Sequence, residues 1–172
     1  MAKRARVLKV GGVLLALLVA GLVAGFLTLG GNGSSPSPSS TGSSVTPTDV
    51  RAQVEQAYLR AWDVWADSLL RLDSSRISDV LTGKALEIVT AQVNEQRDKN
   101  QPVRVRAEHN YRIVLINAIT ASVDDRYINH SVRLDPDTLQ PVEEDPNERV
   151  HRSFTMKLVD GTWKISEIIE YK

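Results

Sequence analysis

The 172-residue chain contains no cysteine. This absence excludes a disulfide framework, a metal site built on thiolates and a lipid anchor attached to a cysteine side chain. Aromatic residues are also scarce, at 5% of the chain, so the position of each one within an apolar pattern can be considered separately. The sequence also contains no Gly-rich phosphate loop, no G-x-S-x-G elbow and no H-E-x-x-H pair. No sequence motif therefore indicates a particular reaction, and we predict no bound cofactor.

Acidic residues are missing from the first 48 positions, which carry four basic residues: Lys3, Arg4, Arg6 and Lys9. The rest of the chain holds 17 basic and 21 acidic residues, a net charge of −4. A body with excess negative charge gives no electrostatic reason to bind nucleic acid. We therefore expect no nucleic-acid partner.

Residues 10–29, VGGVLLALLVAGLVAGFLTL, form an uncharged stretch long enough to cross a bilayer as a helix. A cleaved signal peptide has a shorter apolar region that ends in an A-x-A pattern, and only Val23-Ala24-Gly25 approaches that pattern. We predict a single-pass transmembrane helix that contacts the lipid bilayer. Because the basic residues precede it, residues 1–9 form a cytoplasmic tail and the remainder is extracytoplasmic.

Two features surround this predicted membrane helix. Gly21 and Gly25 form a G-x-x-x-G, which is compatible with a homodimer, although Gly and Ala are common in membrane helices generally. Residues 30–48, GGNGSSPSPSSTGSSVTPT, are too poor in apolar residues to fold. As a flexible linker, this segment would span roughly 20–25 Å. It would hold a folded domain, residues 49–172, near the membrane.

The folded domain is predicted to begin with helices. An N-cap at Thr48-Asp49 precedes a stripe of apolar residues in steps of three and four, and a short helix over 75–81 and a third over 84–98 follow. A stripe that carries three large aromatics is typical of a helix packed on a sheet. The stripe consists of Val54, Tyr58, Ala61, Trp62, Trp65, Leu69 and Leu72.

The second half of the domain is predicted to form four strands, over residues 103–116, 119–134, 149–159 and 162–171. A long polar loop, residues 135–148, separates the second strand from the third. We therefore predict an α+β domain in which about three helices pack on one face of a curved antiparallel sheet of about four strands.

Asp160-Gly161 predicts a tight hairpin between the last two strands, since both turn positions favour positive φ. If Val159 pairs with Thr162, Leu158 faces Trp163 and Met156 faces Ile165. Continued without interruption, the same register places Val150 opposite Tyr171 and Glu167 opposite Phe154. Arg152 then lies diagonal to Glu167, which predicts a partly buried ion pair.

The order of these elements resembles the nuclear transport factor 2-like, or cystatin-like, cone fold. Residues 49–172 are most similar to the outer domain of membrane-anchored plastid-division-type proteins and their bacterial relatives. The resemblance implies the fold far more than a function, because its residues mark turns and strand ends. These residues are Val80, Leu81, Thr82, Gly83, Asp160, Gly161, Trp163, Lys164 and Ile165.

The cone fold also includes isomerases and cyclases with Asp, His or Tyr inside the cone, so the first strand pair decides whether a candidate site exists. A turn at Asn117-Ala118 alone would place His109 opposite Arg126 and Tyr111 opposite Asp124. One more residue in the turn places Tyr111 opposite Asp125 and His109 opposite Tyr127. The sequence leaves both registers open. The second gathers His109, Tyr111, Asp125 and Tyr127 into either an acid–base site or a hydrogen-bond network that satisfies polar atoms.

The three histidines, His109, His130 and His151, fall on three predicted strands, and His151 has the parity of the outer face. We predict no metal site from them, and we expect the acidic loop 135–148 to be solvated rather than to bind calcium. The leading hypothesis is a non-enzymatic, membrane-anchored interaction or scaffolding domain of the cell envelope with a protein partner that the sequence does not name. The alternative is a small-ligand-binding or isomerase-like cone.

Overall fold

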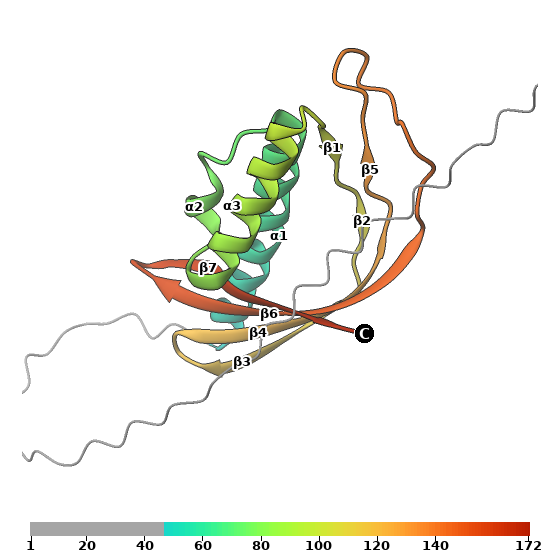
Figure 1. The fold of residues 1–172 in the computed structure, drawn as a ribbon. Coiled ribbons are helices and arrows are strands. Elements are labelled where there is room, and N and C mark those ends of the chain that lie inside the picture. The colour runs from blue at the N-terminus through green and yellow to red at the C-terminus, as the bar shows by residue number, and fades with distance from the viewer. Residues whose placement is uncertain (1–46) are drawn as a thin grey trace, which may run out of the picture. The chain divides into compact units, whose positions relative to one another are not determined.

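The computed structural model describes residues 47–172 (Figure 1). The predicted tail (1–9), the predicted membrane helix (10–29) and the predicted linker up to residue 46 lie outside the described residues. Among residues 47–172, no helix combines the length and the hydropathy needed to cross a membrane.

Three helices open the domain: α1 (Pro47–Arg71), α2 (Ile77–Val80) and α3 (Gly83–Asp98). The predicted stripe of α1 is confirmed as its buried face, with Leu72 only half-buried beyond the helix end. Gly83 starts α3 at a φ of +53°, and a Cβ added there would lie 3.3 Å from the carbonyl oxygen of Ser166. Just before it, the Thr82 N–H donates to the Ile165 carbonyl at 2.9 Å. This turn therefore holds the helices against the last strand.

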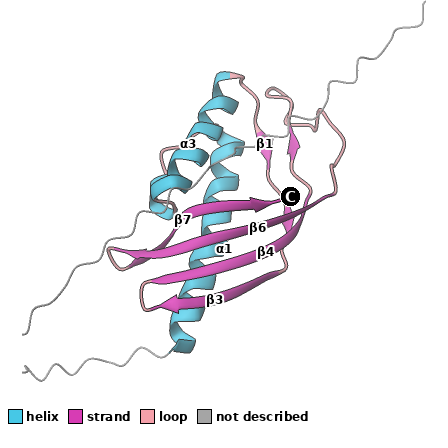
Figure 2. Cartoon of the chain, turned by 60° about the horizontal axis from the view of Figure 1, so that its bottom comes forward, coloured by secondary structure: helices cyan, strands magenta, loops and turns pink. Residues whose placement is uncertain are grey.

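The strands form two antiparallel sheets. In the larger sheet, β4 lies between β6 and the pair β2 and β3, and β7 lies beyond β6; β1 and β5 form a two-stranded sheet. Figures 1 and 2 show α1 and α3 on one face of the strongly curved larger sheet. The α+β cone-like architecture is therefore confirmed. The strands are β1 (Val103–Arg104), β2 (Ala107–Glu108), β3 (Tyr111–Asn117), β4 (Thr120–Asn129), β5 (Val132–Arg133), β6 (Glu148–Val159) and β7 (Thr162–Tyr171).

The prediction of four uninterrupted strands was wrong. The first predicted strand, 103–116, divides into β1, β2 and β3, and the second, 119–134, divides into β4 and β5. A single register nevertheless runs through all these pieces, from Val103 opposite Arg133 to Tyr111 opposite Asp125. At one break the Ser131 hydroxyl accepts the Arg106 N–H at 3.2 Å. A side-chain hydrogen bond thus takes the place of one ladder bond at this break, while the His130 N–H still donates to the Arg106 carbonyl at 2.9 Å.

The second of the two registers is the observed one. Asn117 pairs with Thr120, so the turn residues are Ala118 and Ile119, and Ile116 is the extra residue of a bulge. The Asn117 side-chain oxygen accepts the Ile119 N–H at 3.0 Å. Asn117 therefore precedes the turn and caps it, as Asn commonly does, instead of occupying a central position.

The β6–β7 hairpin follows the prediction only near its turn. Val159 pairs with Thr162, Leu158 with Trp163 and Met156 with Ile165, as expected. A bulge then adds Ser166, whose hydroxyl donates to the Thr155 carbonyl at 3.1 Å.

The expected pairs beyond this bulge were wrong by one position. Tyr171 faces His151 instead of Val150, and Glu167 faces Thr155 instead of Phe154. Arg152 forms its ion pair with Glu170, at 2.5 Å, and not with Glu167. The physical reason is the bulge, since one inserted residue shifts every later partner.

Candidate functional site

A buried carboxylate lies between the sheet and α1. Asp125, on β4, is fully buried, and its Oδ2 accepts two short hydrogen bonds of 2.6 Å, from the Tyr58 hydroxyl on α1 and from His109 Nδ1. Its Oδ1 accepts the backbone N–H of Asn110 at 3.1 Å. Three donors from two segments, α1 and the residues between β2 and β3, therefore meet on one carboxylate. We call Asp125, His109 and Tyr58 the inner network.

The donors keep Asp125 ionised. Burial alone would raise the pKa of Asp125, but the hydrogen bonds from His109 and Tyr58 and the charge of His109 outweigh it, and the pKa is lowered. Burial, reinforced by the Asp125 carboxylate, raises the pKa of Tyr58 far above its ordinary value. The inner network thus joins His109 to an ionised carboxylate and to a phenol that does not release its proton.

The inner network determines the tautomer of His109. An ionised Asp125 can only accept, so His109 carries a proton on Nδ1, and in the neutral ring Nε2 is left with its lone pair. The side chain is 18% exposed, and the Trp62 and Tyr127 rings lie 4.7 Å and 5.7 Å away between centroids. A histidine oriented by a buried carboxylate is a suitable general base, provided that a substrate can reach Nε2.

The indole rings of α1 fill the space beside this histidine. Trp62 and Trp65 are only 9% and 7% exposed, and their rings stack with centroids 5.1 Å apart. Trp65 Nε1 donates to the Gln92 side-chain oxygen at 3.1 Å. The indole N–H of Trp62 lies near the Tyr58 hydroxyl and partly offsets the rise in the pKa of Tyr58. This N–H is buried, and it makes no well-formed hydrogen bond to any residue of 47–172. The cone interior is therefore occupied by the protein's own aromatic side chains.

The structure brings the four predicted site residues onto one face but gives them different partners. His109 contacts Asp125 and Tyr127, whereas the Tyr111 hydroxyl donates to Glu55 of α1 at 2.6 Å. That hydrogen bond raises the pKa of Tyr111 to about 12, and burial raises the pKa of Tyr127 to about 12. Tyr111 therefore belongs to the helix–sheet contact and not to the inner network.

Sequence reasoning missed the roles of Tyr58 and Trp62 in this site. Both belong to the apolar stripe of α1, four positions apart, which shows that they share a helix face. The stripe indicates packing on a sheet, but it does not show which strand residue they meet. One feature of the sequence did point to this contact: Tyr58 lies on the buried face of the helix, and a buried tyrosine hydroxyl needs a hydrogen-bond partner.

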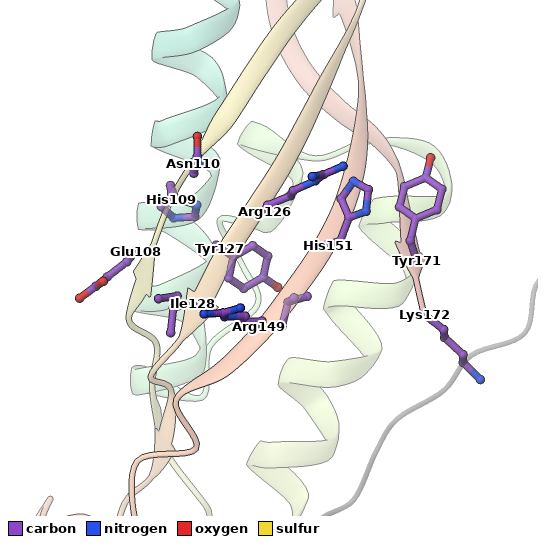
Figure 3. Close-up of a pocket in the computed structure, with 11 residues that line it drawn as sticks. Glu108, His109, Asn110, Arg126, Tyr127, Ile128, Arg149, His151, Tyr171 and Lys172 are labelled. Atoms are coloured by element: carbon purple, nitrogen blue, oxygen red, sulfur yellow. The ribbon is translucent and has the colours of Figure 1, made fainter.

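A hollow of about 650 Å³ lies at one end of the sheet (Figure 3). His109 and Tyr127 reach it from the inner side, while Tyr58, Trp62 and Asp125 do not line it. The remaining lining residues come from the ends of β2, β4, β6 and β7 and the adjoining chain: Glu108, Asn110, Arg126, Ile128, Arg149, Val150, His151, Tyr171 and Lys172.

The three histidines do not converge on one site: each of them pairs with a different aspartate. His130 Nδ1 lies 2.8 Å from Asp145, and His151 Nε2 lies 2.9 Å from Asp124. Within residues 47–172, no group of three or more His, Asp or Glu side chains is arranged to hold a metal ion. In the acidic loop, Glu143 pairs with Arg133, and Asp135 accepts hydrogen bonds from its own turn. These carboxylates thus serve the loop's own structure.

No protein-family model matches the sequence, and no curated protein matches it. Solved structures do. The intermembrane space region of chloroplast protein ARC6 is 13% identical, covers 67% of this chain and 94% of its own, and gives a TM-score of 0.53. The chain has the nuclear transport factor 2-like, cystatin-like cone fold.

Two further solved structures match with lower TM-scores. A cystatin-like domain from Nostoc punctiforme is 13% identical, covers 69% of this chain and 76% of its own, and gives a TM-score of 0.47. A hexachlorocyclohexane dehydrochlorinase from Novosphingobium barchaimii is 12% identical, with coverages of 71% and 88% and a TM-score of 0.46. At these identities the likeness concerns the cone fold alone.

Proposed function

We propose that this protein is a single-pass membrane protein whose cone domain binds a protein partner in the extracytoplasmic space. The observation that carries the interaction role is the filled interior: Trp62 and Trp65 are buried and stack on each other, and neither they nor Asp125 line the hollow. The uncharged stretch 10–29, preceded by basic residues and followed by a Gly/Ser/Pro linker, supports the anchor. The likeness to an intermembrane space region of a chloroplast protein supports an envelope location.

The absence of cysteine makes the proposed topology directly testable. Single cysteines are introduced into the full-length chain as A5C, in the proposed cytoplasmic tail, and K157C, at an exposed position of β6. In intact cells a membrane-impermeant maleimide should label K157C, and A5C should be labelled only after lysis. Labelling in the reverse order, or recovery of a trimmed chain without residues 10–29, would overturn the proposal.

A second candidate function rests on one specific contact, the 2.6 Å hydrogen bond between His109 and Asp125. With Nδ1 held by a carboxylate and 18% of the side chain exposed, His109 could act as a base on a small apolar ligand in the hollow. Tryptophan fluorescence of the full-length protein with apolar ligands, from pH 5 to 8, distinguishes the two. A saturable response that titrates near neutrality and is lost in H109Q favours this candidate.

A further inference from the structure

Two arginines line the hollow at the end of the sheet. Arg126 on β4 and Arg149 on β6 both line it, and both side chains are exposed. Neither guanidinium forms an ion pair with a carboxylate of residues 47–172. Asp124, on the same face, is held by His151, and Glu108, at the rim, is 3.5 Å from His130.

The two arginines are diagonal neighbours across a strand pair. Arg126 is opposite His151, and Arg149 is opposite Ile128. Directly opposite residues of an antiparallel pair share one face, so all four side chains belong to the same side of the sheet. Figure 3 shows Arg126, His151 and Tyr171 following one another from β4 to β7 across this end of the sheet.

The rest of the wall is flat and partly apolar. The His151 and Tyr171 rings stack with centroids 4.5 Å apart, and Ile128, opposite Arg149, also lines the hollow. Tyr171 is 48% exposed, so its ring is accessible. A volume of about 650 Å³ lies within the range of sites that hold small organic molecules. This wall suits an aromatic or otherwise flat apolar group.

We propose that this hollow binds an organic oxyanion, a phosphate or carboxylate joined to a flat apolar group, with Arg126 and Arg149 holding the anion and the His151–Tyr171 pair contacting the apolar part. Arginine is suited to this task because its planar fork donates two parallel hydrogen bonds to one phosphate or carboxylate. The proposed binding residues differ from the inner network: His109 is shared with the lining of the hollow, but the Asp125 carboxylate already accepts three hydrogen bonds and does not line it. The proposal does not depend on the membrane anchor or on a protein partner.

Titration calorimetry with phenyl phosphate tests the proposal on the full-length protein in an uncharged detergent, with inorganic phosphate as the second probe. Phenyl phosphate should bind saturably and more tightly than inorganic phosphate, and binding should weaken with added salt. R126Q and R149Q should each weaken binding by about tenfold, and the double variant should abolish it. Both side chains are exposed, so thermal unfolding should not change.

R60Q is the matched control, since Arg60 is an exposed arginine of α1 that does not line the hollow. It should leave the affinity for phenyl phosphate unchanged, whereas Y171A should weaken binding of phenyl phosphate and leave that of inorganic phosphate unaltered. No saturable binding of either probe, or binding that the R126Q/R149Q double variant retains, would overturn the proposal.

Nanodiscs distinguish a lipid headgroup from a free molecule as the source of the anion. If anionic headgroups occupy the hollow, phenyl phosphate should bind more weakly in discs with phosphatidylglycerol than in discs of phosphatidylcholine. The single variants R126Q and R149Q, which keep weakened binding, should each reduce that difference. Equal affinity in both discs identifies a free organic anion. Both results support the oxyanion site.

Discussion

Asp124 and Asp125 are neighbours in the sequence, yet they lie in opposite environments because successive strand residues point to opposite faces. Both pair with a histidine: Asp125 with His109 inside the cone, and Asp124 with His151 on the outer face. The inner carboxylate is fully buried, whereas the outer carboxylate and histidine side chains are 36% and 31% exposed. The same pair of residue types therefore forms a structural centre on one face and a solvent-screened contact on the other.

The largest expected difference between the two faces concerns the carboxylates themselves. D125A leaves Tyr58, His109 and the Asn110 N–H without their acceptor, and should lower the free energy of unfolding by about 3–5 kcal/mol. D124A is the matched control and should lower it by about 0–1 kcal/mol, because a partly exposed contact with a histidine is screened by solvent and contributes little. Urea unfolding of the full-length protein, followed by circular dichroism, measures both. Equal effects of the two variants would contradict the comparison.

The aromatic side chains on the two faces should differ in the same way. W62A removes a ring that contacts His109, Tyr127 and Phe154 in the interior, and should cost about 3–4 kcal/mol through the cavity it leaves. Y171A removes a half-exposed ring on the outer face and should cost about 0.5–1 kcal/mol. Thermal unfolding of the two variants gives the order. A larger effect of Y171A would show that the outer face is also part of the core.

Single hydroxyl groups give a finer test. Y58F removes only the donor to the buried Asp125 and should lower the free energy of unfolding by about 1.5–3 kcal/mol. Y111F removes the donor to Glu55, in an exposed contact, and should lower it by about 1 kcal/mol or less. Combining Y58F with D125N in a double-mutant cycle measures the coupling directly. A coupling energy near zero would mean that the 2.6 Å contact contributes no stability.

The smallest expected effect appears only in acid. Because the pKa of Asp125 is lowered in the folded protein, its ionised form contributes stability above the ordinary aspartate pKa of about 3.9. That contribution is lost as the pH falls through the lower folded value. The stability of D125N should therefore decline less steeply below about pH 4 than that of the wild type. Unfolding at a series of pH values from 7 to 2.5 provides the measurement.

Much of the fold follows from local patterns. The stripe of α1 has a period set by the helix, so Val54, Tyr58 and Leu69 could be assigned to one buried face. Asp160-Gly161 specifies its turn through the positive φ that it tolerates, and the pairs next to it were predicted correctly. The Ser166 bulge was not predicted, because the hydroxyl that satisfies it bonds to a residue on the neighbouring strand.

The candidate site could be predicted only as two alternatives. The alternating pattern over 103–116 shows which residues share a face, but a shift of one residue exchanges Asp124 for Asp125 opposite Tyr111. The choice depends on a side-chain hydrogen bond of Asn117 and a bulge at Ile116. Tyr58 entered the network from a helix 67 residues away in the sequence, and no local pattern contains that contact.

By itself, the sequence determined the α+β order, the buried side of the long helix and the tight last turn, because helical period, strand alternation and turn preference act over a few residues. The tertiary structure alone decided which aspartate is buried, which tyrosine reaches it and which arginines have no ion pair with a carboxylate of residues 47–172. Those outcomes depend on how distant segments pack, since hydrogen bonds and charges are paired across space and not along the chain.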